Sequence, residues 1–340
     1  MNITTLGIDI AKNVFHLHGT DARGKRVLKK RLRRDQLLTF MQNLPPCLVG
    51  MEACGGAHYW ARKFQGYGHT VKLMAPQYVK PYVKTNKNDY NDAEAIAEAV
   101  GRPTMRFVGI KALWQQDIQT LHRARSRLMQ LRNTLSSHTR GLLMEYGIVV
   151  PKQLGQLRQA LPLILGDATN ELSNNMRSLF AGLYEELQRI DKLINDKDKQ
   201  ILAIHRESAL SQRLGDIEGI GPLTATAFIS AVGDAKMFKR GRDCSAWLGL
   251  VPRQYSTGGK TILGSISKRG DRYLRTNLIH GARSVISKAD NKTDARSRWI
   301  QQLKSRVGMN KACVALANKN ARILWAIMAS GEHYRVSEAV

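Results

Sequence analysis

Three short runs of β-forming residues follow one another within the first 32 residues of this chain, before any helical pattern begins. They cover residues 3–8, 14–18 and 27–32, and such a series predicts a β-meander. Two further runs alternate with helical patterns, which favours parallel pairing. We expect these strands at 47–51 and 71–74, and helices at 35–43, 57–65 and 92–100. Residues 1–107 should therefore form an α/β domain.

Four carboxylates stand at the ends of these elements. Asp9 follows the first run, Glu52 follows the fourth, and Asp89 and Asp92 lie where a loop becomes a helix. Carboxylate oxygens are the ligands that Mg²⁺ prefers, and two such ions about 4 Å apart can clamp the attacking and leaving oxygens of a phosphodiester. The strand order, with acids at strand ends, is that of the ribonuclease H-like fold. We expect the four acids to hold Mg²⁺, with Mn²⁺ as an alternative.

Each acid also has an ordinary explanation. Asp89 or Asp92 could cap the N-terminus of a helix, where Asp is favoured, and Glu52 could be a solvated strand end. Asp9 is harder to explain in this way, because it lies within a strand pattern, and a buried charge needs a partner or a metal.

The chain is strongly basic: its 340 residues include 53 Lys and Arg against 27 Asp and Glu, which gives a net charge of +26. This excess indicates a polyanionic partner, and nucleic acid fits better than a membrane. A ribosomal or chromatin-like binder without chemistry fits the charge equally well. Four scattered cysteines, no signal peptide and no apolar run of roughly 18 residues predict a cytoplasmic protein with free thiols.

The middle of the chain, residues 108–210, is predicted to be a coiled-coil helical linker. Seven-residue spacing places one apolar line along 111–146 and two along 176–204, as in helices that pair through a narrow apolar stripe. The residues are Trp114, Leu121, Leu128, Leu135 and Leu142, with Ile118 beside them, then Met176, Leu183 and Ile190, and Phe180, Leu187, Ile194 and Ile201. An antiparallel hairpin is the simplest arrangement. Pairing within one chain and between chains both remain open, although some dimerisation is expected.

Residues 211–340 form a third, mainly helical region. It opens with Gly219-Ile220-Gly221-Pro222, a turn typical of helix–hairpin–helix DNA binders, in which glycine lets backbone N–H groups approach a phosphate. An ordinary tight turn between two helices is the alternative. A basic stretch follows, and residues from 273 to about 330 have a helical pattern. We expect nucleic-acid contacts from Arg253, Lys260, Lys268, Arg269, Arg272 and Arg275.

Residues 249–260, Gly-Leu-Val-Pro-Arg-Gln-Tyr-Ser-Thr-Gly-Gly-Lys, place two hydroxyls beside two glycines. A hydroxyl there could attack a phosphate, with Arg253 and Lys260 stabilising the developing charge. Taken alone, these residues favour a flexible loop that only grips phosphate, since Ser, Thr and Gly are common in loops.

Several motifs together closely resemble the IS110/IS1111 family of insertion-sequence transposases, with details that favour the IS1111 branch. They are Gly-Ile-Asp-Ile-Ala-Lys, Met-Glu-Ala-Cys-Gly, Asn-Asp-Tyr-Asn-Asp-Ala, Gly-Ile-Gly-Pro, the 249–260 segment and Ser-Lys-Arg-Gly-Asp-Arg-Tyr-Leu-Arg. The resemblance spans essentially the whole chain. It implies a RuvC-like DEDD domain over 1–107, a coiled-coil linker over 108–210, and a transposase domain with a nucleophilic serine over 211–340.

The resemblance further implies that Asp9, Glu52, Asp89 and Asp92 bind metal. DNA would be cut and rejoined through a covalent phosphoserine. A structured guide RNA would pair with donor and target DNA, and the protein would act as a dimer or, on DNA, a tetramer in the bacterial cytoplasm. Relatives of the IS110 branch carry the nucleophile directly before the glycine, where this chain has Thr257, and Ser256 lies one residue earlier. A one-residue gap would bring Ser256 into the role, so Ser256 is the expected nucleophile and Thr257 the alternative. The competing functions are a metal-dependent nuclease or Holliday-junction resolvase, and a non-catalytic nucleic-acid-binding protein.

Overall fold

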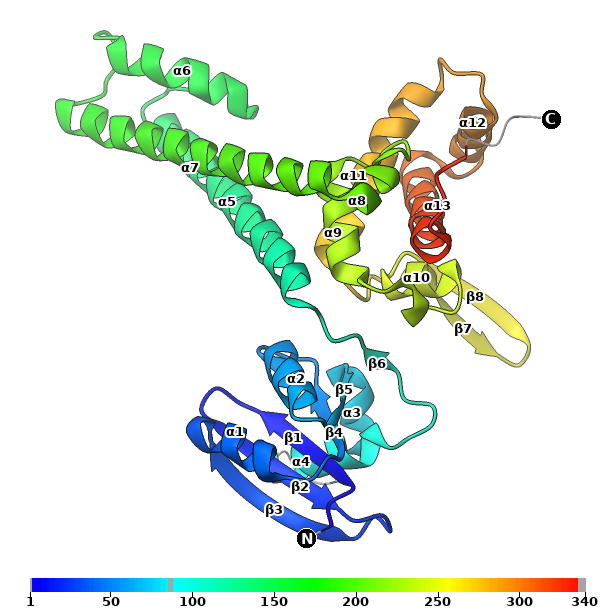
Figure 1. Cartoon of the computed structure of the whole chain (residues 1–340). Coiled ribbons are helices and arrows are strands. Elements are labelled where there is room, and N and C mark those ends of the chain that lie inside the picture. The colour runs from blue at the N-terminus through cyan, green and yellow to red at the C-terminus, as the bar shows by residue number, and fades with distance from the viewer. Residues whose placement is uncertain (1, 85–87, 336–340) are drawn as a thin grey trace. The chain divides into compact units, whose positions relative to one another are not determined.

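The computed structural model describes residues 2–84 and 88–335. The chain divides into two compact units, Met1–Ala112 and Leu113–Val340 (Figure 1). The first is mixed α/β and the second is mostly helical, which confirms the predicted fold class at this level. The predicted linker and C-terminal region pack together in the second unit, so the three-part division remains a prediction from sequence. Among the described helices, none has the length and apolarity to cross a membrane.

The first unit is built on a six-stranded sheet in the order β3-β2-β1-β4-β5-β6. β1, β2 and β3 form the predicted antiparallel meander, while β4 lies parallel to β1, and β5 parallel to β4. The short strand β6 was not predicted and pairs antiparallel with β5. The strands are Thr5–Ile10, Val14–Thr20, Arg26–Arg33, Leu48–Glu52, Thr70–Met74 and Phe107–Val108.

Helices cover both faces of this sheet. On one face, the alternate residues Leu6, Ile8 and Phe15 join the core beneath α1 (Arg34–Asn43) and α2 (Ala57–Gly66). On the other face, α4 (Asp89–Val100) packs on β1, β2 and β4, with α3 (Pro76–Val79) and a 3-10 turn, Lys80–Tyr82, beside it. Because side chains alternate along a strand, Gly7, Asp9 and Glu52 all lie on the α4 face.

The second unit begins with three helices: α5 (Leu113–Met144), α6 (Leu154–Gly166) and α7 (Asn174–Glu207). The guanidinium of Arg125 pairs with Asp198, and that of Arg132 pairs with Asp191. From Arg125 to Arg132 the chain moves seven residues toward the C-terminus of α5, and from Asp198 to Asp191 it moves seven residues toward the N-terminus of α7. The two helices therefore run antiparallel within one chain. Pairing between chains stays a prediction.

The buried line of α5 differs from the predicted one. The predicted leucines are only partly covered, and full burial falls one position later, at Gln115, His122, Ser136 and Leu143. The polar members of this line hydrogen-bond inside the unit: His122 contacts the Tyr273 hydroxyl and the Thr226 hydroxyl, each at 3.0 Å. On α7, Phe180, Leu187, Ile194 and Ile201 are buried as predicted.

Helix α6 was not predicted, because Pro151, Gly155 and Pro162 interrupt its sequence. Pro162 lies inside the helix, although proline lacks the N–H that a helix interior uses. Leu157 and Leu161 are fully buried in the cluster that also contains Phe180. Tertiary packing therefore compensates for a weak local preference.

The remaining helices share one core. They are α8 (Ala209–Gly215), α9 (Pro222–Val232), the 3-10 turn Ala235–Met237, α10 (Gly241–Trp247), α11 (Arg272–Ala289), α12 (Ala295–Val307) and α13 (Met309–Ser330). Helices form from Arg272 onward, as predicted, with two breaks. In the α8–α9 turn, a Cβ on Gly219 would lie 2.8 Å from the Gly281 carbonyl oxygen. Gly219 thus serves close packing on α11, while Gly221 at the start of α9 is exposed.

Candidate metal centre and candidate nucleophile

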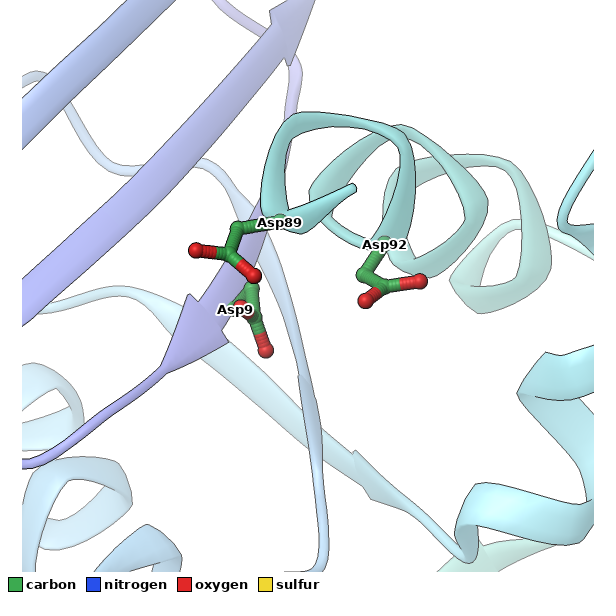
Figure 2. Close-up of side chains that lie close together, drawn as sticks. All are labelled: Asp9, Asp89 and Asp92. Carbon is green, nitrogen blue, oxygen red and sulfur yellow. The ribbon is translucent and has the colours of Figure 1, made fainter. Parts of the chain in front are cut away.

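Three of the four predicted acids meet near the C-terminal end of β1, on the face of the sheet that α4 covers. Asp9 stands near the end of β1, and Asp89 and Asp92 belong to the first turn of α4 (Figure 2). One carboxylate oxygen from each lies within 4.8 Å of the others. The helix cap is Asn88, whose side chain accepts a hydrogen bond from the Tyr90 N–H at 2.9 Å. Neither Asp89 nor Asp92 is the cap, so their ordinary explanation fails.

Two glycines place α4 on the sheet. A Cβ on Gly7 would lie 2.5 Å from the Ala97 nitrogen and would overlap the Ala93 carbonyl oxygen. A Cβ on Gly50 would lie 2.8 Å from the Val100 Cβ. Only residues without a side chain permit this approach, and it brings the first turn of α4 over Asp9. These glycines were not singled out from sequence.

The site concentrates negative charge. Burial, followed by the charges of Asp92 and Asp89, raises the pKa of the Asp9 carboxyl. Burial, followed by the charges of Asp9 and Asp92, raises the pKa of Glu52. Glu52 lies outside the 4.8 Å group but near enough to feel the charges of two of its members. A hard divalent cation fits this set, because its ligands would be oxygens and its charge would relieve the crowding.

His16 belongs to the site and was missed in the sequence. It pairs with Asp9 across the β1–β2 ladder, and its side chain is 10% exposed. Its Nδ1 lies 3.6 Å from an oxygen of Asp89 and has no hydrogen-bond partner within the described chain. The register of the meander could have identified His16 from the sequence, since residues opposite each other in a ladder share a face of the sheet. That register is set by the hairpin geometry.

The segment with the candidate nucleophile is a β-hairpin rather than the expected loop. β7 (Pro252–Thr257) and β8 (Lys260–Ile266) are joined by Gly258 and Gly259, whose φ angles are +55° and +74°. Two residues with positive φ form the tight turn that suits the twist of a hairpin. Every residue of β7 is exposed, and the hairpin projects from the helices of its unit (Figure 1).

The two candidate hydroxyls point to opposite faces of this hairpin, because they are neighbours in one strand. Ser256 pairs with Thr261, and its Oγ accepts a hydrogen bond from Gln254 Nε2 at 2.8 Å. Thr257 pairs with Lys260. Lys260, one of the two cations predicted to assist the hydroxyl, therefore lies on the face of Thr257, and Ser256 has Gln254 beside it.

One predicted nucleic-acid contact needs correction. Arg275 is only 8% exposed, and its guanidinium donates to the carbonyl oxygens of Leu248 at 3.0 Å and Arg269 at 3.1 Å. It ties together the two loops from which the hairpin rises, so it is not available to a phosphate. The remaining cations of the prediction are exposed: Arg253, Lys260, Lys268, Arg269 and Arg272.

A cluster of carboxylates on a sheet, in a strongly basic chain, is typical of enzymes that process nucleic acids with divalent cations. Comparison with known proteins agrees. Residues 6–148 match a model described as a transposase, of the IS110 DEDD type, and residues 211–298 match the transposase IS116/IS110/IS902 family. The chain belongs to the IS110/IS1111 family of transposases.

Three relatives match along nearly their whole length. The chain is 51% identical over 336 residues to a probable family 20 transposase of Pseudomonas aeruginosa, covering 98% of this chain and 99% of the relative. It is 47% identical to the transposase for insertion sequence element IS1111A of Coxiella burnetii, covering 98% and 92%. It is 39% identical to the transposase for IS1328 of Yersinia enterocolitica, covering 97% and 98%.

Proposed function

We propose that this protein is an insertion-sequence transposase that cuts and rejoins DNA, using metal-binding acids in its first unit and the Ser256 hydroxyl in its second. The observation that carries the proposal is the convergence of Asp9, Asp89 and Asp92 within 4.8 Å in a chain of this family. The strand order of the first sheet, with its meander followed by parallel strands, supports a RuvC- or ribonuclease H-like fold. Two long antiparallel helices support the coiled-coil interpretation of the linker.

Asp9, Asp89 and Asp92 would hold a divalent cation, Mg²⁺ or Mn²⁺, and Glu52, which feels the charges of Asp9 and Asp92, would join them. When bound, such a cation would supply positive charge to the phosphoryl oxygens. The acids themselves fix its place, because the strand and the helix that carry them are packed against each other through Gly7 and Gly50. His16 lies beside the cluster, with its Nδ1 3.6 Å from an oxygen of Asp89.

Ser256 is the proposed nucleophile. Its Oγ forms a bond to phosphorus while the bond from phosphorus to a DNA oxygen breaks, and the proton lost by the hydroxyl is balanced by the one that the leaving oxygen takes up. A hydroxyl of the partner DNA strand later attacks the same phosphorus and releases the serine. The hydrogen bond from Gln254 orients Oγ. The phosphodiester bond energy is kept in the ester, so no nucleotide cofactor is required.

The proposal includes a structured guide RNA that pairs with donor and target DNA, and an oligomer, a dimer or a tetramer on DNA. The net charge of +26 supports binding to several nucleic-acid strands. Sequencing the RNA that copurifies with the protein tests this point. An element-derived RNA is expected, and its absence from an active preparation contradicts the guided mechanism.

A covalent-trapping experiment tests the chemistry. Suicide DNA, in which the cut strand is lost after the first step, should yield a protein–DNA adduct with the wild-type chain and with Thr257→Ala. Ser256→Ala and Asp9→Asn should yield none, with recombination lowered about a thousandfold or more. Hydrolysis without an adduct would instead establish a nuclease or resolvase that uses water. Full activity of Asp9→Asn would establish a protein whose acids have no catalytic role.

A further inference from the structure

The edge strand β3 carries an unusual density of positive charge. Eight of the twelve residues 23–34 are Lys or Arg. Cations on an edge strand often serve only to block pairing with other sheets. A binding role is therefore considered only for cations on the face of β3 that the acids share.

The register places some of these cations on the face that carries the acids. Arg31 pairs with His16, which pairs with Asp9, so the three lie in one row across β3, β2 and β1. Lys29 and Arg33 share this face, because they lie two residues to either side of Arg31. The intervening Lys30 faces the other way, and its Nζ lies 5.0 Å from the centre of the Phe40 ring.

Helix α4 leaves this part of the face open. Lys29, Arg31 and Arg33 are exposed beside its first turn. The Lys29 Nζ lies 4.6 Å from the centre of the Tyr90 ring, which packs edge-on against His16 at 4.5 Å. Arg33 pairs with Asp35, whereas Lys29 and Arg31 form no ion pair with any residue that the structure describes.

We propose that Lys29, Arg31 and Arg33 form a phosphate-binding ledge that holds duplex DNA beside the acid cluster. Alternate residues of a strand are about 6.6 Å apart, and β3 lies about 10 Å from β1, two strand spacings away. A phosphodiester at the acids would therefore have neighbouring phosphates within reach of the ledge. Their negative charge matches the unpaired cations. We take DNA as the occupant because the ledge shares its face of the sheet with the acids. This choice of occupant rests on the proposed function.

The test compares two adjacent residues of equal charge on opposite faces. Binding of the full-length protein to a DNA duplex is measured from low to moderate salt, with divalent ions chelated. Arg31→Gln should weaken binding about threefold and reduce the slope of log K against log salt by about 0.9. The double variant Lys29→Gln/Arg31→Gln should reduce it by about 1.8. Lys30→Gln should leave the slope unchanged, and Arg31→Lys should restore it.

Equal effects of Arg31→Gln and Lys30→Gln would overturn the proposal, because they would show that binding depends only on the net charge of the protein and not on the face that carries the cation. So would weakened binding to a structured RNA with unaltered binding to DNA, which would assign the ledge to RNA. Thermal unfolding of each variant confirms that it folds. Because no catalysis is measured, failure of Asp9→Asn to stop recombination would contradict the proposed function without altering this result.

Discussion

The acid cluster and the Ser256 hairpin carry the two halves of the proposed chemistry, but they are built in opposite ways. Asp9, Asp89 and Asp92 are fixed by a sheet register and by a helix packed on Gly7 and Gly50. Ser256 stands on a strand with no buried residue, paired with β8 above a base that Arg275 holds together. The first site is organised before any ligand arrives. A bare two-stranded hairpin is only marginally stable, so the second should become fully ordered on its DNA substrate.

The contrast has a physical reason. Metal ligands must converge from separate elements, and their like charges repel one another, so the surrounding packing must hold them together. A hydroxyl is neutral and needs access to a phosphorus atom. The first site therefore depends on packing between its elements, whereas the second depends on exposure.

The largest expected effect comes from breaking the helix packing over the acids. Gly7→Ala places a methyl group against the backbone of α4 at Ala93 and Ala97. We expect a loss of more than about 3 kcal/mol in unfolding free energy, because backbone atoms cannot move aside as side chains can. Mg²⁺ binding measured by calorimetry should weaken too. Gly55→Ala is a control, since nothing lies within 4 Å of its Cβ; equal losses in both variants would contradict the packing role.

The base of the hairpin is the next point to test. Arg275→Ala removes a buried guanidinium and leaves the Leu248 and Arg269 carbonyl oxygens without their donor. We expect a loss of about 3 kcal/mol in urea unfolding. The nearby exposed Arg272→Ala should change stability by less than about 0.5 kcal/mol and weaken DNA binding instead. If the two variants exchanged these effects, Arg275 would be a phosphate contact and not a structural link between the two loops.

The support beneath the hairpin should also respond to pH through His122, which links α5 to α9 and α11. Burial, and then the charge of Arg125, lowers the pKa of His122 from 6.5 to about 4. The unfolded chain then binds the proton more readily, so this contribution is complete above pH 6.5 and is lost as the pH falls toward 4. It should amount to about 2 kcal/mol between pH 7 and pH 5. Unfolding of His122→Gln should show a correspondingly smaller pH dependence; an unchanged one would contradict the buried neutral imidazole.

The smallest effect separates the two sites most directly. In metal-free protein, Asp9→Asn should raise the unfolding free energy by about 1 kcal/mol, because it relieves repulsion among the acids. The raised pKa of the wild-type Asp9 carboxyl also predicts that ionised Asp9 is destabilising, because the folded state loses stability as the pH rises through that pKa. Ser256→Ala should change stability by less than about 0.5 kcal/mol. Mg²⁺ should stabilise wild type and Ser256→Ala, but not Asp9→Asn. Destabilisation by Asp9→Asn without metal would contradict the repulsion.

The first five strands of the first unit and its helices α1, α2 and α4 could be predicted to within about three residues of their ends, because alternation and apolar periodicity are local signals. The short elements α3 and β6 could not. The hairpin of β7 and β8 was not predicted, since neither strand has a buried residue and its apolar side chains, Tyr255, Ile262 and Leu263, are exposed. On α5, the seven-residue spacing of leucines correctly predicted a long helix, but the fully buried residues lie one position later than the leucines. His122 and Gln115 occupy the covered positions because α9 and α11 supply their hydrogen-bond partners.

By itself, the sequence determined the α/β start, the long helices, the family and three acids that do converge. Those properties follow from local pattern and from motifs whose residues are chemically distinctive. Only the tertiary structure decided that His16 lies against Asp89, that Ser256 and Thr257 face apart, and that Arg275 holds two loops together. It also placed Lys29 and Arg31 beside the acids. These relations depend on strand register and close packing between distant segments, where a shift of one residue would turn every side chain to the other face.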